Sequence, residues 1–453
     1  MRSADKRALA PSMKHAFSIL QTCVPPYRLP FFDLLAAELG PNFKVVAGDR
    51  FFDPSLRTVA GGRPWYSRCG NIFLFGDNAV WQTGKAVKDL AGSPLVVEGN
   101  PRSLRTWLIL MSAKRRGVPA AVWGHARGRG SRRMSIIRRA LFSLASHIIC
   151  YCYNEREYLT RLFPNKTIIV AGNSSVHRKD CAPLTEPAES RNAVLFMGRL
   201  VASKKPMLLL QAVEILQKNG HDIGAVFIGE GPEKTFCERY AARAGLKGIH
   251  FAGQEFDVNK QRKLAQHCFA LASPGYIGLS ALDALGFGLP VAYCPTEPNS
   301  PEVETLVDDE NALRFTRDSA SALSSVLYDF YENRVAWLAR GAEHCRTISE
   351  KYSIEHMAEE FTKFFRETAE LAGKQSVEAS LEERSNGFVF DPKSIDALSE
   401  ALRRIADQKT KRLGDQETGG LTEMGRRSRE IVAKFSCENF AQQALRAAEA
   451  ASA

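Results

Sequence analysis

Short apolar runs alternate with helix-forming segments from residue 16 to residue 294, and this alternation limits the fold more than any other feature of the chain. Each run has four to seven residues rich in Val, Ile or aromatic side chains, which is typical of strands buried in a parallel sheet. Helical periodicity lies between the runs; in residues 29–39, Phe32, Leu35 and Leu39 share one face. The sequence therefore predicts an α/β fold with doubly wound parallel sheets.

The strands and helices fall into two groups, separated by a polar segment. Residues 177–191 contain two prolines and no periodicity, so we interpret them as an interdomain linker. The first group predicts a domain over residues 1–176, with strands at 16–20, 43–48, 94–99, 119–124, 147–153 and 167–173. The second group predicts a domain over residues 192–372, with strands at 192–198, 225–229, 249–253, 268–273 and 290–294 and helices at 206–220, 232–245 and 279–288.

The C-terminal part contains a weak internal repeat. Residues 311–327 resemble residues 386–402, and KYSIE at 351–355 resembles KFSCE at 434–438. A duplicated strand–helix unit and two ordinary αβ segments both explain the similarity. We assign residues 373–453 to a C-terminal αβ and helical extension that resembles a repeat of residues 311–370.

Composition excludes several classes of protein. With 45% apolar and 25% charged residues, the chain is typical of a globular protein rather than a disordered one. No apolar run reaches the roughly 18–20 residues that span a bilayer, and the N-terminus is a poor secretory signal. The ten cysteines are scattered without zinc-site spacing, so we expect free thiols in a reducing cytoplasm and no metal site.

The net charge of +11 is concentrated in one segment. Residues 99–154 contain no Asp or Glu. In residues 131–144, arginine pairs alternate with apolar residues at helical spacing, which favours a helix on an anionic membrane surface. A solvated basic face is the alternative, and nucleic acid is not expected, because no aromatic side chains are interleaved with the arginines. The cations are Arg102, Arg105, Lys114, Arg115, Arg116, Arg127, Arg129, Arg132, Arg133, Arg138 and Arg139.

Three loops of the second domain follow predicted strands. GRLVASKKP (198–206) carries three cations, Arg199, Lys204 and Lys205, just before a helix, which is typical of an anion site. GEGPEK (229–234) lacks the third glycine of a dinucleotide fingerprint, so NAD binding is not predicted. SPGYIGLSALDALGFGLPVAY (273–293) forms a glycine turn before a helix. Because such folds bind nucleotides at the carboxyl ends of their strands, the three loops predict a nucleotide site.

These segments carry a family resemblance. GRLVASKK, FIGEGP, HFAG, the Ser-Pro-Gly turn and LDALGFGLPVAY resemble the nucleotide-binding half of family 4 retaining glycosyltransferases, over residues 192–327. PPYRLPFFDLLA, VEGNPR and VWGH, in the N-terminal domain, resemble bacterial polysaccharide and lipopolysaccharide members. The resemblance implies GT-B architecture, with two Rossmann-like domains facing a cleft, the first binding the acceptor and the second the nucleotide sugar. It implies transfer from a nucleotide-diphosphate sugar to a glycan or lipid-diphosphate acceptor, with retention of configuration.

The resemblance also implies roles for individual residues. Arg199 and Lys204 would bind the donor diphosphate. His125 would contact the donor or the acceptor, and the alternative is that it is a histidine of a turn or of the core. The nucleotide sugar is a co-substrate, and no cofactor is implied. The other implied donor-binding residues are Gly198, Gly229, Gly231, Phe251, Gly253, Gly275, Gly278, Leu279 and Asp283.

The chain departs from the family pattern at one position. The family has two glutamates eight positions apart, and Gly275 and Asp283 stand in their places here. Asp283 could still bind the ribose hydroxyls, but Gly275 has no side chain to contact the donor sugar. A subgroup with the Ser-Pro-Gly turn also lacks that glutamate, so we do not infer inactivity. A non-catalytic scaffold and a basic nucleic-acid-binding protein remain the alternatives to an enzyme.

Overall fold

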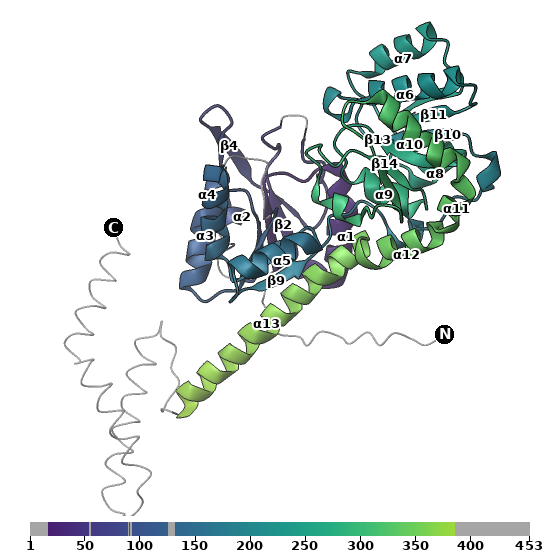
Figure 1. The fold of residues 1–453 in the computed structure, drawn as a ribbon. Helices are drawn as coiled ribbons and strands as arrows, with labels where there is room; N and C mark the ends of the chain where they lie inside the picture. Colours follow the sequence, from purple (N-terminus) through teal and green to yellow (C-terminus); the bar gives the residue numbers. More distant parts are fainter. Residues whose placement is uncertain (1–16, 54–55, 89, 91–92, 126–131, 386–453) are drawn as a thin grey trace, which may run out of the picture. The chain divides into compact units, whose positions relative to one another are not determined.

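The computed structural model of the protein describes residues 17–53, 56–88, 90, 93–125 and 132–385. Two parallel sheets flanked by helices make up most of it, as Figure 1 shows. Their core side chains come from the short apolar runs, because each strand is covered on both faces. The predicted α/β class and the two doubly wound sheets are therefore confirmed.

The N-terminal sheet has seven strands in the order β3-β2-β1-β6-β7-β8-β9. All six predicted strands are present in it. The strands are β1 (Phe17–Gln21), β2 (Phe43–Ala47), β3 (Tyr66–Arg68), β6 (Leu95–Glu98), β7 (Ala120–Trp123), β8 (His147–Cys150) and β9 (Thr167–Val170). Their helices are α1 (Leu29–Leu39), α2 (Lys85–Lys88), α3 (Leu104–Arg115), α4 (Arg132–Leu144) and α5 (Tyr153–Leu162), and an antiparallel hairpin is formed by β4 (Gly70–Leu74) and β5 (Ala79–Thr83).

The C-terminal sheet has six strands in the order β12-β11-β10-β13-β14-β15. The order reverses between β10 and β13, so the loops that follow these strands border one crevice. The strands are β10 (Ala193–Met197), β11 (Gly224–Ile228), β12 (Ile249–Gly253), β13 (Cys268–Ser273), β14 (Val291–Tyr293) and β15 (Ala312–Arg314). The helices are α6 (Pro206–Lys218), α7 (Lys234–Arg243), α8 (Val258–Ala265), α9 (Ser280–Gly286), α10 (Ala320–Glu332), α11 (Arg334–Ala339) and α12 (Gly341–Lys351).

The segment interpreted as a linker packs along the C-terminal domain. It contains two short 3-10 helices, η4 (Arg178–Asp180) and η5 (Ala188–Ser190). Leu184 is buried, and the buried Arg191 guanidinium donates hydrogen bonds to the carbonyl oxygens of Leu184, Glu186 and Cys268. A buried guanidinium with these acceptors fixes the chain at the entrance to β10.

Helix α13 (Ile354–Ser385) brings the chain back to the N-terminal domain. Phe361 is fully buried, and its ring lies 5.0 Å from that of Phe31 and 4.9 Å from that of Trp123. Phe365 lies 5.3 Å from Phe17. The buried positions recur every three or four residues, as one apolar helix face requires. Residues 354–368 thus contact the N-terminal sheet, although we predicted them as part of the second domain.

The first copy of the predicted repeat forms β15 and α10. The second copy, at residues 386–402, lies outside the described residues, as does most of the predicted extension 373–453. Within the described part of the chain, no helix combines the length and the hydrophobicity needed to cross a bilayer.

The aromatic contact between α13 and the N-terminal sheet predicts a large stability effect. We expect Phe361→Ala to lower the free energy of unfolding by about 3–5 kcal/mol, because it leaves a cavity beside the Phe31 and Trp123 rings. Denaturant unfolding followed by tryptophan fluorescence measures this. Phe236→Ala, on the exposed side of α7, is the control and should stay within about 0.5 kcal/mol of wild type. Equal effects of the two substitutions would contradict the assignment.

Candidate functional site

Two loops of the C-terminal domain are joined by backbone hydrogen bonds at the carboxyl ends of β10 and β13. The Gly275 N–H donates to the Lys204 carbonyl at 3.1 Å, and the Tyr276 N–H to the Ser203 carbonyl at 3.3 Å. A Cβ at position 275 would lie only 2.1 Å from the Ser203 oxygen. Only glycine therefore allows this approach, and a glutamate has no room here unless the loops separate.

The predicted glycines after β10 and β11 also lie together. A Cβ on Gly229 would lie 1.9 Å from the Gly198 carbonyl oxygen, and the Gly229 N–H donates to Gly253 at 2.7 Å. A Cβ on Gly231 would likewise lie 2.2 Å from the Leu200 carbonyl oxygen. These contacts leave backbone atoms, with no side chains, exposed beside the first loop. Phe251 stacks on Phe227 at 4.7 Å, so its ring takes part in core packing.

The two lysines of the first loop point to different partners. Lys204 is buried, and its ammonium lies 4.1 Å from the centre of the Tyr276 ring. Lys205 has a left-handed backbone, with φ of 52°, and pairs instead with Glu297 and Asp318. Lys204 is thus the lysine held at the glycine turn.

Arg199 lies in the same loop and differs from Lys204 in its surroundings. Its side chain is exposed, and no ion pair is seen between it and any residue that the structure describes. The structure therefore holds one predicted cation firmly against the turn and leaves the other at the surface.

Asp283 lies on α9 beside this turn. Desolvation by the surrounding protein raises the pKa of Asp283 to about 7, although a hydrogen bond from Ser175 and the positive charge of Lys204 oppose the shift. The predicted residues Gly278 and Leu279 stand just before α9, where the first N–H groups of a helix have no partner within it. Ser175 was not predicted; its only sequence signal is its place just after the apolar run at 167–173.

The N-terminal domain contributes polar groups near the ends of β7 and β8. His125 is exposed, its Nδ1 lies 3.8 Å from Glu155 Oε1, and its ring lies 4.5 Å from that of Tyr151. Glu155 is buried. The structure therefore places His125 at the surface of this edge and not in a core.

Two arginines of the basic segment lie partly buried near this edge. Arg138, on α4, has two guanidinium nitrogens, Nε and Nη1, that are buried and have no hydrogen-bond partner among the described residues. Burial lowers the pKa of Arg138, Glu155 raises it and Arg102 lowers it again, so the three groups are electrostatic neighbours. Arg102 lies 3.7 Å over the Phe52 ring. Sequence reasoning had placed both arginines only in a general basic segment.

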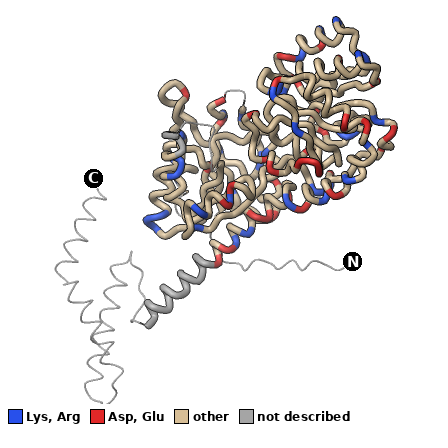
Figure 2. Tube along the Cα trace, viewed as in Figure 1, with Lys and Arg blue, Asp and Glu red and all other residues tan. Residues whose placement is uncertain are grey.

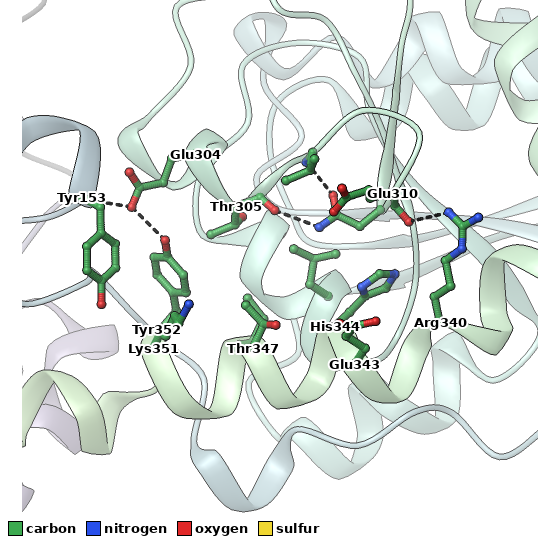
Figure 3. Close-up of a pocket in the computed structure, with 14 residues that line it drawn as sticks. Tyr153, Glu304, Thr305, Glu310, Arg340, Glu343, His344, Thr347, Lys351 and Tyr352 are labelled. Carbon is green, nitrogen blue, oxygen red and sulfur yellow. Dashed lines mark hydrogen bonds between the residues drawn. The ribbon is translucent and has the colours of Figure 1, made fainter.

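Glu304 connects the two domains. It lies on the 3-10 helix η7 (Pro301–Thr305), and its carboxylate accepts the N–H groups of Tyr153 and Asn154 at 3.0 Å each, which caps α5. The Tyr352 hydroxyl donates to the same carboxylate at 2.9 Å, as Figure 3 shows. Ser300 precedes η7 and lies close to Gly278, next to the glycine turn. The segment 300–305 therefore contacts both the start of α5, just after β8, and the start of α9.

Among the residues that the structure describes, no group of three or more His, Cys, Asp or Glu side chains is arranged to hold an ion. The positive charge near Asp283 is that of the Lys204 ammonium.

The close approach at Gly275 predicts a specific sensitivity. We expect Gly275→Ala to lower the free energy of unfolding by about 1–3 kcal/mol, because the added Cβ overlaps the Ser203 carbonyl. Chemical denaturation measures it. Gly61→Ala adds a Cβ with no atom within 4 Å and serves as the control. A Gly275→Ala protein as stable as the control would show that the loops are not in contact.

Residues 183–365 match the family glycosyl transferases group 1. No curated protein sequence matches the chain. Among solved structures, HepE of Anabaena in complex with UDP is 15% identical, with a TM-score of 0.56 over 80% of this chain and 100% of that one. A glycosyltransferase from Rickettsia africae is 11% identical, with a TM-score of 0.56 over 78% and 99%. Sucrose-phosphate synthase of Thermosynechococcus elongatus is 15% identical, with a TM-score of 0.54 over 78% and 99%.

Such low identities show a shared fold and no more. The chain has the GT-B fold of these neighbours, with two Rossmann-like domains built on parallel sheets. The matched residues 183–365 include Lys204, Gly275 and Asp283, and the match supports a glycosyltransferase.

Proposed function

We propose that this protein is a retaining glycosyltransferase, related to family 4, that moves a sugar from a nucleotide-diphosphate sugar to a glycan or lipid-linked glycan. One observation carries the proposal: Lys204 is buried at the glycine turn between β10 and β13, within electrostatic reach of Asp283. A cation and a carboxyl group so placed suit the diphosphate and the ribose of one nucleotide. The family match over the same residues supports this use.

On the donor side, each group has a distinct role. The Lys204 ammonium neutralises charge on the leaving diphosphate, and the exposed Arg199 adds a second cation when the donor is bound. The N–H groups of Gly278 and Leu279 donate to the phosphates. Asp283, whose carboxyl group lies near Ser175, accepts ribose hydroxyls. HepE, which shares the fold, has been solved with UDP, so uridine nucleotides are the first probes to try.

The glycine that replaces the family glutamate at position 275 changes how the two loops pack. Because position 275 carries no side chain, the Lys204 backbone lies directly against the turn. A glutamate would separate the two loops and move Lys204 away. We propose that this subgroup exchanges a contact to the donor sugar for a tightly held lysine, so other side chains must select the sugar.

On the acceptor side, we propose that Arg102 and Arg138 bind an anionic group, such as the diphosphate of a lipid-linked glycan. Two guanidinium nitrogens of Arg138 have no hydrogen-bond partner among the residues that the structure describes, and phosphate oxygens fit a guanidinium well. The acceptor hydroxyl then attacks on the face that the diphosphate leaves, and the departing phosphate takes its proton. His125 contacts the reacting sugars, and no side chain needs to act as general base.

The same domain offers a surface for an anionic membrane. Lys and Arg mark α3 and α4 in Figure 2, and neither helix carries an Asp or Glu. α4 buries Leu141 and Phe142 in the core and exposes Ile136, Ile137 and Arg139. We propose that this face of α4 rests on the inner face of the cytoplasmic membrane, where each Lys or Arg near the surface contributes about 1 kcal/mol. The predicted contacts of Arg127 and Arg129 lie outside the described residues.

Donor binding is tested first. We expect UDP or another nucleotide to raise the melting temperature of the wild-type protein in proportion to saturation. Lys204→Ala and Arg199→Ala should each reduce turnover by about 10²–10³, as the loss of one well-placed donor typically does. Lys218→Ala, at an exposed position of α6, should leave turnover unchanged. Full turnover in both loop variants would refute the assignment, whereas nucleotide binding without turnover on any acceptor would favour a scaffold.

The acceptor site makes a separate prediction. We expect Arg138→Gln to raise KM at least tenfold for an acceptor carrying a diphosphate, since a charge-assisted hydrogen bond is lost. The same glycan without the diphosphate should show no change. Arg239→Gln removes an exposed arginine of α7, in the other domain, and is the control. Equal KM increases for the charged and uncharged acceptors would contradict this role.

A further inference from the structure

One buried carboxylate is shared by two cations beside the glycine turn. Glu297, in the loop after β14, is 7% exposed. Its Oε1 lies 2.5 Å from the Lys205 ammonium and 2.8 Å from Nε of Arg317. Lys205 also pairs with the exposed carboxylate of Asp318. Because Lys205 directly follows Lys204 in the chain, this cluster lies beside the proposed donor site.

The backbone of Lys205 depends on these ion pairs. Its φ of 52° lies in the left-handed region, which glycine adopts freely and a residue with a Cβ adopts at a cost. Lys205 separates the short 3-10 helix η6 (Ala202–Lys204) from α6, of which it is the N-cap. Two carboxylates bind its ammonium and offset the cost of this conformation. The direction of Lys204, one residue earlier, depends on the same turn.

The loop that carries Glu297 also contacts the glycine turn. The Glu297 carbonyl accepts the Asn299 N–H at 2.7 Å, and Asn299 Oδ1 accepts the Ile277 N–H at 2.9 Å. The Ser300 N–H donates to the Ile277 carbonyl at 2.9 Å. Ile277 belongs to the glycine turn before α9. Residues 294–300 therefore bind the lysine loop on one side and the glycine turn on the other.

Glu297 is the main partner of Lys205. Burial lowers the pKa of Lys205, but hydrogen bonds to Asp318 and Glu297 outweigh this effect, so the pKa is raised. The hydrogen bond from Lys205 lowers the pKa of Asp318. The Asp318 side chain is 64% exposed, whereas that of Glu297 is 3% exposed. Because solvent weakens an exposed ion pair, the pair with Glu297 contributes more.

We propose that Glu297 is a positioning residue of the donor site. Through Lys205 it stabilises the left-handed turn that directs the neighbouring Lys204 to the glycine turn, and it acts on Lys205 rather than on the donor. This role rests on the function proposed for Lys204 in binding the diphosphate. A glycine at position 205 would adopt the same turn without any partner.

Nucleotide affinity of the full chain, measured by isothermal titration calorimetry, tests this role. The probes are UDP, GDP, ADP and dTDP, and the one that binds the wild-type protein most tightly is used throughout. We expect Glu297→Gln to weaken its binding about tenfold, because a neutral amide no longer pairs with the ammonium. Lys205→Ala keeps a Cβ and loses the ion pairs, so it should weaken binding to a similar extent.

The control and the rescue variant separate positioning from a general loss of stability. Glu214→Gln removes a carboxylate that pairs with Lys218 in the middle of α6, and should leave the affinity unchanged. Lys205→Gly supplies the turn without strain or ion pair, and should bind within about threefold of wild type. In the Lys205→Gly background, Glu297→Gln should have no further effect, because the two residues are coupled. Circular dichroism melting confirms that each variant is folded.

The possible failures are distinguishable. The positioning role is overturned if Glu297→Gln binds the nucleotide as tightly as wild type, or if it weakens binding equally in the Lys205→Gly background. Should Glu297→Gln not fold, equal affinities of Lys205→Ala and Lys205→Gly would overturn it. Binding that depends on Lys204 and not on Glu297 removes only this role. If none of the four nucleotides binds the wild-type protein, the proposed donor site fails and the role of Glu297 fails with it.

Discussion

The contact between the Gly275 turn and the Ser203–Lys204 segment is the constraint on which the site depends. Two backbone hydrogen bonds join the two loops, which approach so closely that a Cβ on Gly275 would lie 2.1 Å from the Ser203 carbonyl oxygen. The chain then turns at Lys205, where φ is positive, so that two adjacent lysines diverge. Lys205 is used in ion pairs with Glu297 and Asp318, and Lys204 is left at the turn beside Tyr276 and Asp283.

The two domains are joined by contacts of different chemistry. Glu304 caps α5 of the N-terminal domain with a carboxylate, which suits the positive end of a helix. The first half of α13 adds aromatic packing through Phe361 and Phe365. The polar contact borders an open crevice lined by Tyr153, Glu304 and Tyr352, and the apolar one lies in the core of the first domain.

Periodicity predicted the sheets well, because buried parallel strands have a strong apolar signal. The hairpin of β4 and β5 was missed, because β4 is only partly buried and its apolar residues 72–75 were not recognised as a strand. The loops that carry Arg199, Lys204, Gly275 and Asp283 could be predicted from spacing and family resemblance. The roles of Ser175 and Glu304 could not, because each depends on contacts between segments more than a hundred residues apart.

A crystal structure of the protein with UDP tests the central claim most directly. We expect the diphosphate to lie at the Gly275 turn, with a phosphate oxygen about 2.7–2.9 Å from the Lys204 ammonium and a ribose hydroxyl on Asp283. A diphosphate bound elsewhere, with Lys204 still resting on the Tyr276 ring, would contradict the proposed role of this turn in binding the donor.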